Sequence, residues 1–143
     1  MVPGPSRTRA GGPVCNALPD PVATGDLVIA VGPVPAGVGG DVVDGTYVFT
    51  GGNYYGGGAG GVPGTVLATI GATVVLSAGN YDEISSFPGQ QTETSSGTIT
   101  FAGTTGSSTS SCPSVQSGAG DYTFDGATLT FYGPDSSESY ALQ

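Results

Sequence analysis

The chain has 143 residues, enough for a single domain, because one hydrophobic core usually occupies about 100–150 residues. Its net charge is −9, and Arg7 and Arg9 are its only cations, since it contains neither Lys nor His. Nucleic acids and anionic membrane surfaces are therefore excluded as partners, because both are bound through basic side chains. The chain has no run of 18 or more apolar residues, so no membrane-spanning helix is expected.

The N-terminal part separates into a leader and one apolar arm. Residues 1–26 are predicted to be a flexible leader, and residues 1–14 lack the apolar stretch of an intact signal peptide. The next five residues, predicted to form a strand, are the most apolar run of the chain: Leu27, Val28, Ile29, Ala30 and Val31. A Gly/Pro-rich linker, residues 32–40, follows. On such a linker the strand either closes its own sheet or is an assembly strand that pairs with a second copy of the chain.

A short pattern recurs four times in residues 27–143, which we expect to form one all-β domain. Each unit has a glycine, a threonine, alternating core residues and a closing glycine, and the units begin at Gly45, Gly71, Gly97 and Gly126. A period of 26 to 29 residues fits one hairpin with its turns. The pattern therefore predicts an antiparallel meander.

Three hairpins are predicted along this meander. The first runs over residues 65–78 with a turn at 71–72, and the second over residues 93–102 with a turn at Gly97. The third runs over residues 121–132, where Asp125-Gly126 is a strong turn signal between alternating strands. With residues 81–85 and 138–142 the count reaches eight or nine strands. Sequential hairpins favour an up-and-down barrel over the alternative, a β-sandwich.

Two segments rich in small residues, 51–64 and 103–120, are predicted to be long loops. Tyr54 and Tyr55 lie among the glycines of the first loop, and Tyr47 and Phe49 lie in the strand before it. Most aromatic residues are expected to form the core and cross-strand pairs. These four are the candidate ligand-binding residues, because aromatic rings at a barrel mouth offer stacking surfaces to a sugar or an apolar ligand.

The two cysteines, Cys15 and Cys112, lack the close Cys/His spacing of a zinc site, so they are predicted to form a disulfide. Only 9% of the residues are charged, so Ser, Thr, Gly and Asn must cover the surface. A disulfide and such a surface are typical of extracellular and cell-surface bacterial proteins. Asp41 and Asp44 lack the spacing of a calcium loop, so no metal site is predicted.

Several segments of the chain resemble a known group of proteins. They are residues 15–18 and 44–50, the later cysteine, the hairpin of residues 122–131 and the end at residues 140–143. In these features the chain resembles secreted proteins of myxobacteria and their relatives with lipocalin-like barrels. The resemblance implies a β-barrel and export, and it transfers no catalytic residue.

Catalysis is not predicted, because without His and Lys the usual bases and nucleophile activators are missing. A carboxylate pair for glycoside hydrolysis has only five candidates: Asp82, Glu83, Glu93, Asp121 and Asp125. Asp121 and Asp125 are ordinary turn residues, and adjacent Asp82 and Glu83 face opposite sides of a strand. No cofactor is predicted. Two functions remain: a barrel that binds a small apolar ligand or a glycan, or a structural surface protein that assembles into a filament by donating residues 27–31.

Overall fold

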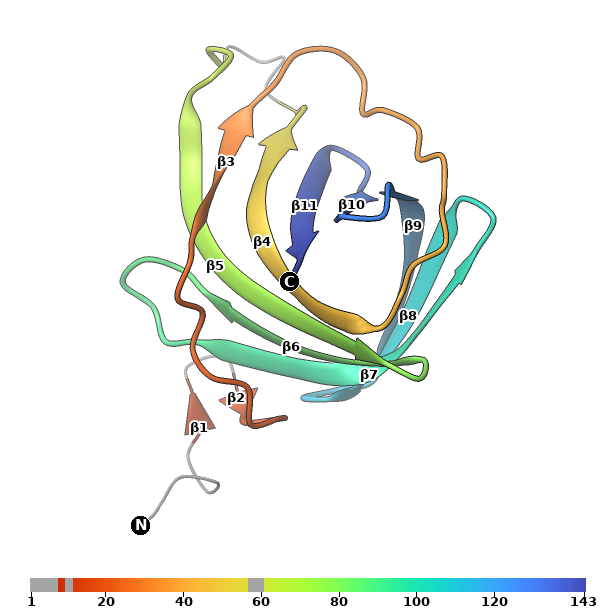
Figure 1. The fold of residues 1–143 in the computed structure, drawn as a ribbon. Helices are drawn as coiled ribbons and strands as arrows, with labels where there is room; N and C mark the ends of the chain where they lie inside the picture. The colour runs from red at the N-terminus through yellow and green to blue at the C-terminus, as the bar shows by residue number, and fades with distance from the viewer. Residues whose placement is uncertain (1–7, 10–11, 57–60) are drawn as a thin grey trace.

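The computed structural model describes residues 8–9, 12–56 and 61–143, which contain eleven strands and no helix (Figure 1). The strands are β1 (Thr8–Arg9), β2 (Gly12–Pro13), β3 (Gly25–Ile29), β4 (Gly45–Tyr54), β5 (Val66–Ser77), β6 (Asn80–Ser86), β7 (Glu93–Ala102), β8 (Thr105–Cys112), β9 (Gln116–Phe124), β10 (Thr128–Tyr132) and β11 (Ser136–Leu142). Strands β1 and β2 pair with each other, and the other nine form a closed barrel.

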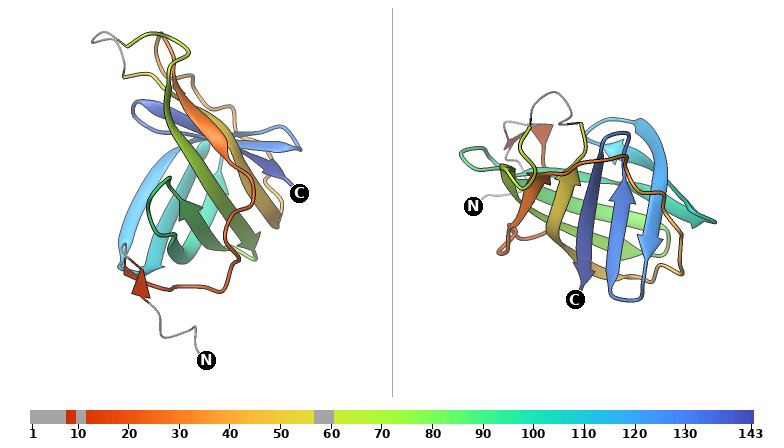
Figure 2. Two further views of the ribbon diagram at one scale, coloured as in Figure 1. Left: turned by 90° about the vertical axis from the view of Figure 1, so that its left-hand side faces the viewer. Right: turned by 90° about the horizontal axis from the view of Figure 1, so that it is seen from above.

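The barrel has the order β10-β11-β4-β3-β5-β6-β7-β8-β9, and β9 pairs with β10 to close it. From β5 to β11 each strand is antiparallel to the next, as predicted for a meander. Strand β3 is the exception, because it is parallel to β4. Seen from above, β3, β4, β11, β10 and β9 follow one another along one side of the barrel (Figure 2). The predicted all-β barrel of about nine strands is therefore confirmed.

The apolar arm lies within its own barrel. Strands β4 and β5 pair only where Gly45–Val48 face Thr73–Leu76, and β3 fills the space where they diverge. The strand starts and ends two residues earlier than expected. Beyond it, the Ala30 amide still donates to the Tyr54 carbonyl at 2.9 Å, whereas Val31 is 72% exposed.

The Gly/Pro-rich linker, expected to be flexible, is docked along β9 before the chain enters β4 (Figure 1). The Gly39 amide donates to the Tyr122 carbonyl at 2.8 Å, and the Phe124 amide donates to the Gly39 carbonyl at 2.9 Å. A Cβ at Gly37 would stand 2.7 Å from the Tyr122 nitrogen, so only glycine permits this approach. Gly37, Gly39 and Gly40 thus serve close packing against the barrel.

Two of the predicted turns are wrong. Strand β5 continues through Gly71, and β7 continues through Gly97. A Cβ at Gly71 would meet the Ser86 hydroxyl at 2.8 Å and the Pro21 Cβ at 3.0 Å, and one at Gly97 would stand 2.6 Å from the Ser110 Cα. These glycines therefore allow close contact within a continuous strand. The predicted hairpin at Asp125-Gly126 is confirmed by the pairing of β9 with β10.

The predicted loop 103–120 is also wrong, because residues 105–112 and 116–124 form the hairpin β8–β9. Ser, Thr and Gly satisfy the backbone hydrogen bonds of a sheet as well as other residues do, so composition alone does not make a loop. Of the other predicted loop, residues 51–54 belong to β4 and residues 57–60 lie outside the described residues.

Residues 14–24, expected to be part of a flexible leader, run along the outside of the barrel. The predicted Cys15–Cys112 disulfide is present and ties this segment to the end of β8. The Asn16 side-chain amide donates to the carbonyls of Glu83 and Ser95, both at 3.1 Å. Ile84, the residue after Glu83 in β6, is completely buried.

One end of the barrel interior is packed with aromatic and aliphatic side chains. The rings of Tyr47 and Phe124 meet edge to face at 6.2 Å, and those of Phe49 and Tyr140 at 5.5 Å. The buried cluster comprises Tyr47, Phe49, Ala72, Leu76, Tyr122, Phe124, Leu129 and Tyr140. Partly buried hydrophobic side chains, among them Val74, Ile99 and Phe131, pack against this cluster.

Candidate ligand cavity

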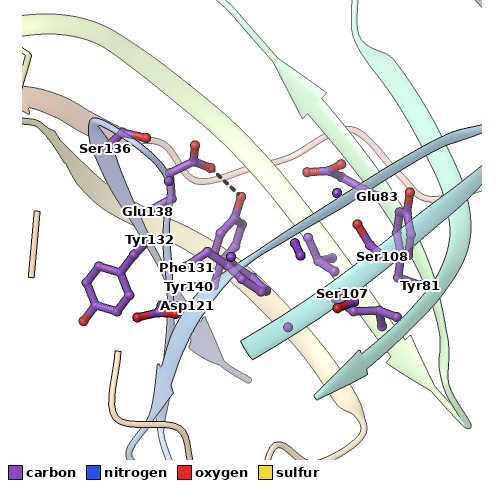
Figure 3. A pocket seen from close by; sticks show the side chains of 17 residues that line it. Tyr81, Glu83, Ser107, Ser108, Asp121, Phe131, Tyr132, Ser136, Glu138 and Tyr140 are labelled. Carbon is purple, nitrogen blue, oxygen red and sulfur yellow. Dashed lines mark hydrogen bonds between the residues drawn. The ribbon is translucent and has the colours of Figure 1, made fainter. Parts of the chain in front are cut away.

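Beside this packed cluster the barrel interior holds a cavity of about 400 Å³ (Figure 3). Its volume lies within the range of about 300–1,000 Å³ that is typical of small-molecule sites. Five of the barrel strands, β6, β8, β9, β10 and β11, contribute most of its lining. The lining residues include Tyr81, Glu83, Gly118, Phe131, Glu138 and Tyr140.

The cavity exists because the wall formed by β8 and β9 carries only small residues apart from Asp121. Gly106 pairs with Gly120, and Ser108 pairs with Gly118, and all four line the cavity. A Cβ at Gly118 would find no atom within 4 Å. On the same inner face of β9, Tyr122 and Phe124 fill the packed end. Glycine and serine therefore leave open a volume that larger residues on these strands would occupy.

The cavity opens where β9 and β10 separate. Their last paired residues are Asp121 and Tyr132, so residues 116–120 of β9 pair only with β8. Asp121, Tyr132 and Gly133 line the cavity at this point. The Gly37 amide donates to the Asp121 carboxylate at 3.1 Å, which holds this side chain in place.

Two carboxylates reach the cavity from different strands. Figure 3 shows Glu83 of β6 and Glu138 of β11 directed into the same space, with the Tyr140 hydroxyl between them. The Tyr140 hydroxyl donates to Oε1 of Glu138 at 3.2 Å. Glu83 makes no side-chain hydrogen bond or ion pair with any residue that the structure describes. The site therefore combines one hydrogen-bonded and one unpartnered carboxylate.

Burial and nearby charges both raise the pKa values of Glu83 and Tyr140. Desolvation, followed by the nearby charge of Glu138, raises the pKa of Glu83 to about 7. Its side chain keeps some accessible surface because it lines the open cavity, but protein surrounds it on nearly every side. Burial, with the charges of Glu138 and Glu83, also raises the pKa of Tyr140, so its hydroxyl remains a donor at neutral pH.

Four aromatic residues, Tyr81, Phe131, Tyr132 and Tyr140, line the cavity. The Tyr140 ring contacts Phe49 in the packed cluster and lies 6.0 Å from Phe131, so it forms the floor of the cavity. The Tyr81 hydroxyl, on the opposite wall, is hydrogen-bonded to the Ser95 hydroxyl at 3.1 Å. The rings are thus fixed by contacts outside the cavity, and their remaining faces are available to a ligand.

The candidate ligand-binding residues from the sequence are not among those lining this cavity. Tyr47 and Phe49 belong to the packed cluster, with 0% and 2% of their surfaces exposed. Tyr54 and Tyr55 are half-buried at the end of β4. The sequence offers Glu83 only as part of a carboxylate pair and does not offer Glu138, because Ser-Glu-Ser is typical of a solvent-facing strand; Glu138 is indeed exposed, but it also lines the cavity.

Among residues 8–9, 12–56 and 61–143 there is no group of three or more His, Cys, Asp or Glu side chains suited to a metal ion. The same residues include no helix long and apolar enough to cross a membrane. No protein-family model, no curated protein and no solved structure matches the chain. The part of the family resemblance that is shown is the closed, nine-stranded all-β barrel.

Proposed function

We propose that the protein is a non-enzymatic binding barrel that holds a small, largely apolar ligand in this cavity. The observation that carries the proposal is the wall of β8 and β9, where Gly106, Ser108, Gly118 and Gly120 line a cavity of about 400 Å³ beside a tightly packed cluster and a Cβ at Gly118 would meet no atom within 4 Å. Protein interiors are normally filled to crystal-like density, so a cavity kept open by a row of small residues suits a ligand.

The alternative function, filament assembly by strand donation, has weaker support. It requires an arm that leaves its own barrel, whereas here β3 fills the space between its own β4 and β5. The Cys15–Cys112 disulfide supports export to an oxidising compartment, which we propose as the location of the binding barrel.

The binding function is tested with N-phenyl-1-naphthylamine, an uncharged dye whose fluorescence rises in an apolar site. The wild type should bind the dye and Gly118→Leu should not, because the leucine side chain projects into open cavity space. The control is Ser117→Leu, which adds the same side chain at the neighbouring exposed position of β9. Failure of the wild type to bind, or equal binding by Gly118→Leu, contradicts the proposal.

A further inference from the structure

We propose that the cavity selects an organic cation, with an ammonium group held by Glu83 and Glu138 and an apolar body lying against the rings of Tyr81 and Phe131. This inference rests on the proposed binding function and names the chemical class of the ligand.

Unbalanced negative charge is the first reason. Glu83 and Glu138 face the same cavity, and Asp121 lines its opening. The only cations of the chain are Arg7 and Arg9, so no residue from position 10 onward can neutralise these carboxylates. Glu138 is exposed at the cavity, but Glu83 is almost enclosed by protein, and burying an unpaired carboxylate is costly, so a ligand cation beside Glu83 removes that cost. A bound anion would add to the repulsion instead.

Hydrogen-bonding capacity is the second reason. An ammonium group has only donors, and an ionised carboxylate has only acceptors. Glu83 makes no hydrogen bond through its side chain with the described residues, and Glu138 uses one oxygen to accept from Tyr140. Acceptor positions therefore remain open on both carboxylates. Serine hydroxyls of the lining, at Ser108 and Ser136, provide further acceptors.

The aromatic rings are the third reason. A cation is attracted to the face of an aromatic ring, and the attraction is strongest where water is excluded. Tyr81, Phe131 and Tyr140 bring three rings to the cavity that holds the two carboxylates. Rings beside carboxylates suit an ammonium group with carbon substituents better than they suit a metal ion, which needs more oxygen ligands than these two side chains provide.

Proton linkage provides a specific signature. The titratable groups that line the cavity with Glu83 are Tyr81 on its own strand, Asp121 on β9, Tyr132 on β10, and Glu138 and Tyr140 on β11. Because the pKa of Glu83 is about 7, part of the population carries a proton on this carboxyl at neutral pH. A cation favours the ionised form, so binding at pH 7 should release protons.

The test uses three ligands that share an indole ring: tryptamine, which is a cation, tryptophol, which is neutral, and indole-3-acetate, which is an anion. The protein contains no Trp, so indole fluorescence anisotropy reports the ligand without background. Tryptamine should bind at least about tenfold more tightly than tryptophol, since hydrogen bonds to charged groups are the stronger ones. Indole-3-acetate should bind most weakly.

Variants assign this preference to the carboxylates. Glu83→Gln should weaken tryptamine binding about tenfold or more, leave tryptophol binding within about twofold and abolish proton release measured by calorimetry in buffers of different ionisation enthalpy. Glu93→Gln, at an exposed position outside the cavity lining, makes the same charge change and should alter none of these results.

The following results would overturn the inference that the cavity selects an organic cation. If tryptophol binds as tightly as tryptamine, or if Glu83→Gln affects the two equally, the site does not select cations, but the binding function stands. If calcium at millimolar concentration displaces tryptamine, the carboxylates are a metal site. If none of the three ligands binds while N-phenyl-1-naphthylamine does, only the cation inference fails, and if nothing binds, both proposals fail.

Discussion

Glu83 and Glu138 lie on strands far apart in the sequence and direct their carboxylates into one cavity, where the charge of Glu138 adds to burial in raising the pKa of Glu83. The two strands, β6 and β11, are not neighbours in the barrel. Closure of the sheet therefore brings these residues together, and no local sequence motif contains both.

This relationship predicts how stability depends on pH. The pKa of Glu83 is raised from 4.5 to about 7, so between these values the folded chain binds more protons than the unfolded chain. Stability must then fall as pH rises through this interval. Glu83→Gln removes the effect, and at pH 8 the variant should be more stable than the wild type by up to about 3 kcal/mol. At pH 4 the two should be equally stable.

Urea unfolding at pH 4, 6 and 8 measures this difference. Glu93→Gln serves as the control, because Glu93 is exposed and outside the cavity lining. The pH-dependent contributions of the other carboxylates to stability are shared by the two proteins and cancel when the variant is compared with the wild type. If the difference between Glu83→Gln and the wild type stays constant with pH, Glu83 does not titrate as stated.

The disulfide should contribute strongly to stability. It joins residues 97 positions apart, and the chain-entropy model assigns a loop of this size about 4.7 kcal/mol. Replacing both cysteines with serine should lower the free energy of unfolding by up to this amount and release residues 14–24 from the barrel. Chemical denaturation and limited proteolysis check the two effects. Cleavage before Gly25 at the wild-type rate would show that the bond does not hold this segment.

Two glycines, Gly97 in β7 and Gly118 in β9, should respond oppositely to alanine. At Gly97 the new Cβ would collide with the Thr109 carbonyl and stand 2.6 Å from the Ser110 Cα, so the strands must separate. We expect Gly97→Ala to cost about 2 kcal/mol or more. At Gly118 a Cβ meets no atom within 4 Å, and Gly118→Ala should be neutral or stabilise by about 0.5 kcal/mol. Thermal unfolding of the pair measures this contrast, and similar melting temperatures would refute it.

The sequence predicts those features that depend on alternation and turn chemistry. Tyr122, Phe124, Leu129 and Phe131 alternate with polar residues around Asp125-Gly126, and this hairpin has the expected strands and turn. The disulfide follows from two isolated cysteines. Gly71 was misread as a turn because its role, close contact with Ser86 and Pro21, depends on distant segments.

The cavity was not predictable in the same way. Its wall is made of glycines and serines in β8 and β9, whose lack of large side chains resembles a loop in sequence. Its carboxylates face inward only because of the register of β6 and β11, and β11 shifts register at Ser139 and Tyr140 relative to β4. One-residue shifts exchange the two faces of a strand, so the orientation of Glu138 was not fixed by its neighbours.

The position of β3 predicts the behaviour of the arm. Val28 pairs with Asn53 on one side and Val66 on the other, within the space between β4 and β5. Val28→Pro removes a backbone donor and should destabilise the barrel by on the order of 2 kcal/mol. Val22→Pro is the matched control, because Val22 is fully exposed and outside every strand, and it should have little effect.

Solution mass separates pairing within the chain from donation between chains. With β3 in its own barrel, the wild type should sediment as a monomer at all concentrations, and deletion of residues 1–40 should unfold the remainder because β4 and β5 lose the strand between them. Sedimentation velocity and circular dichroism measure these two properties. A wild-type polymer that becomes a folded monomer after the deletion would instead establish strand donation, since the barrel would then be complete without its own arm.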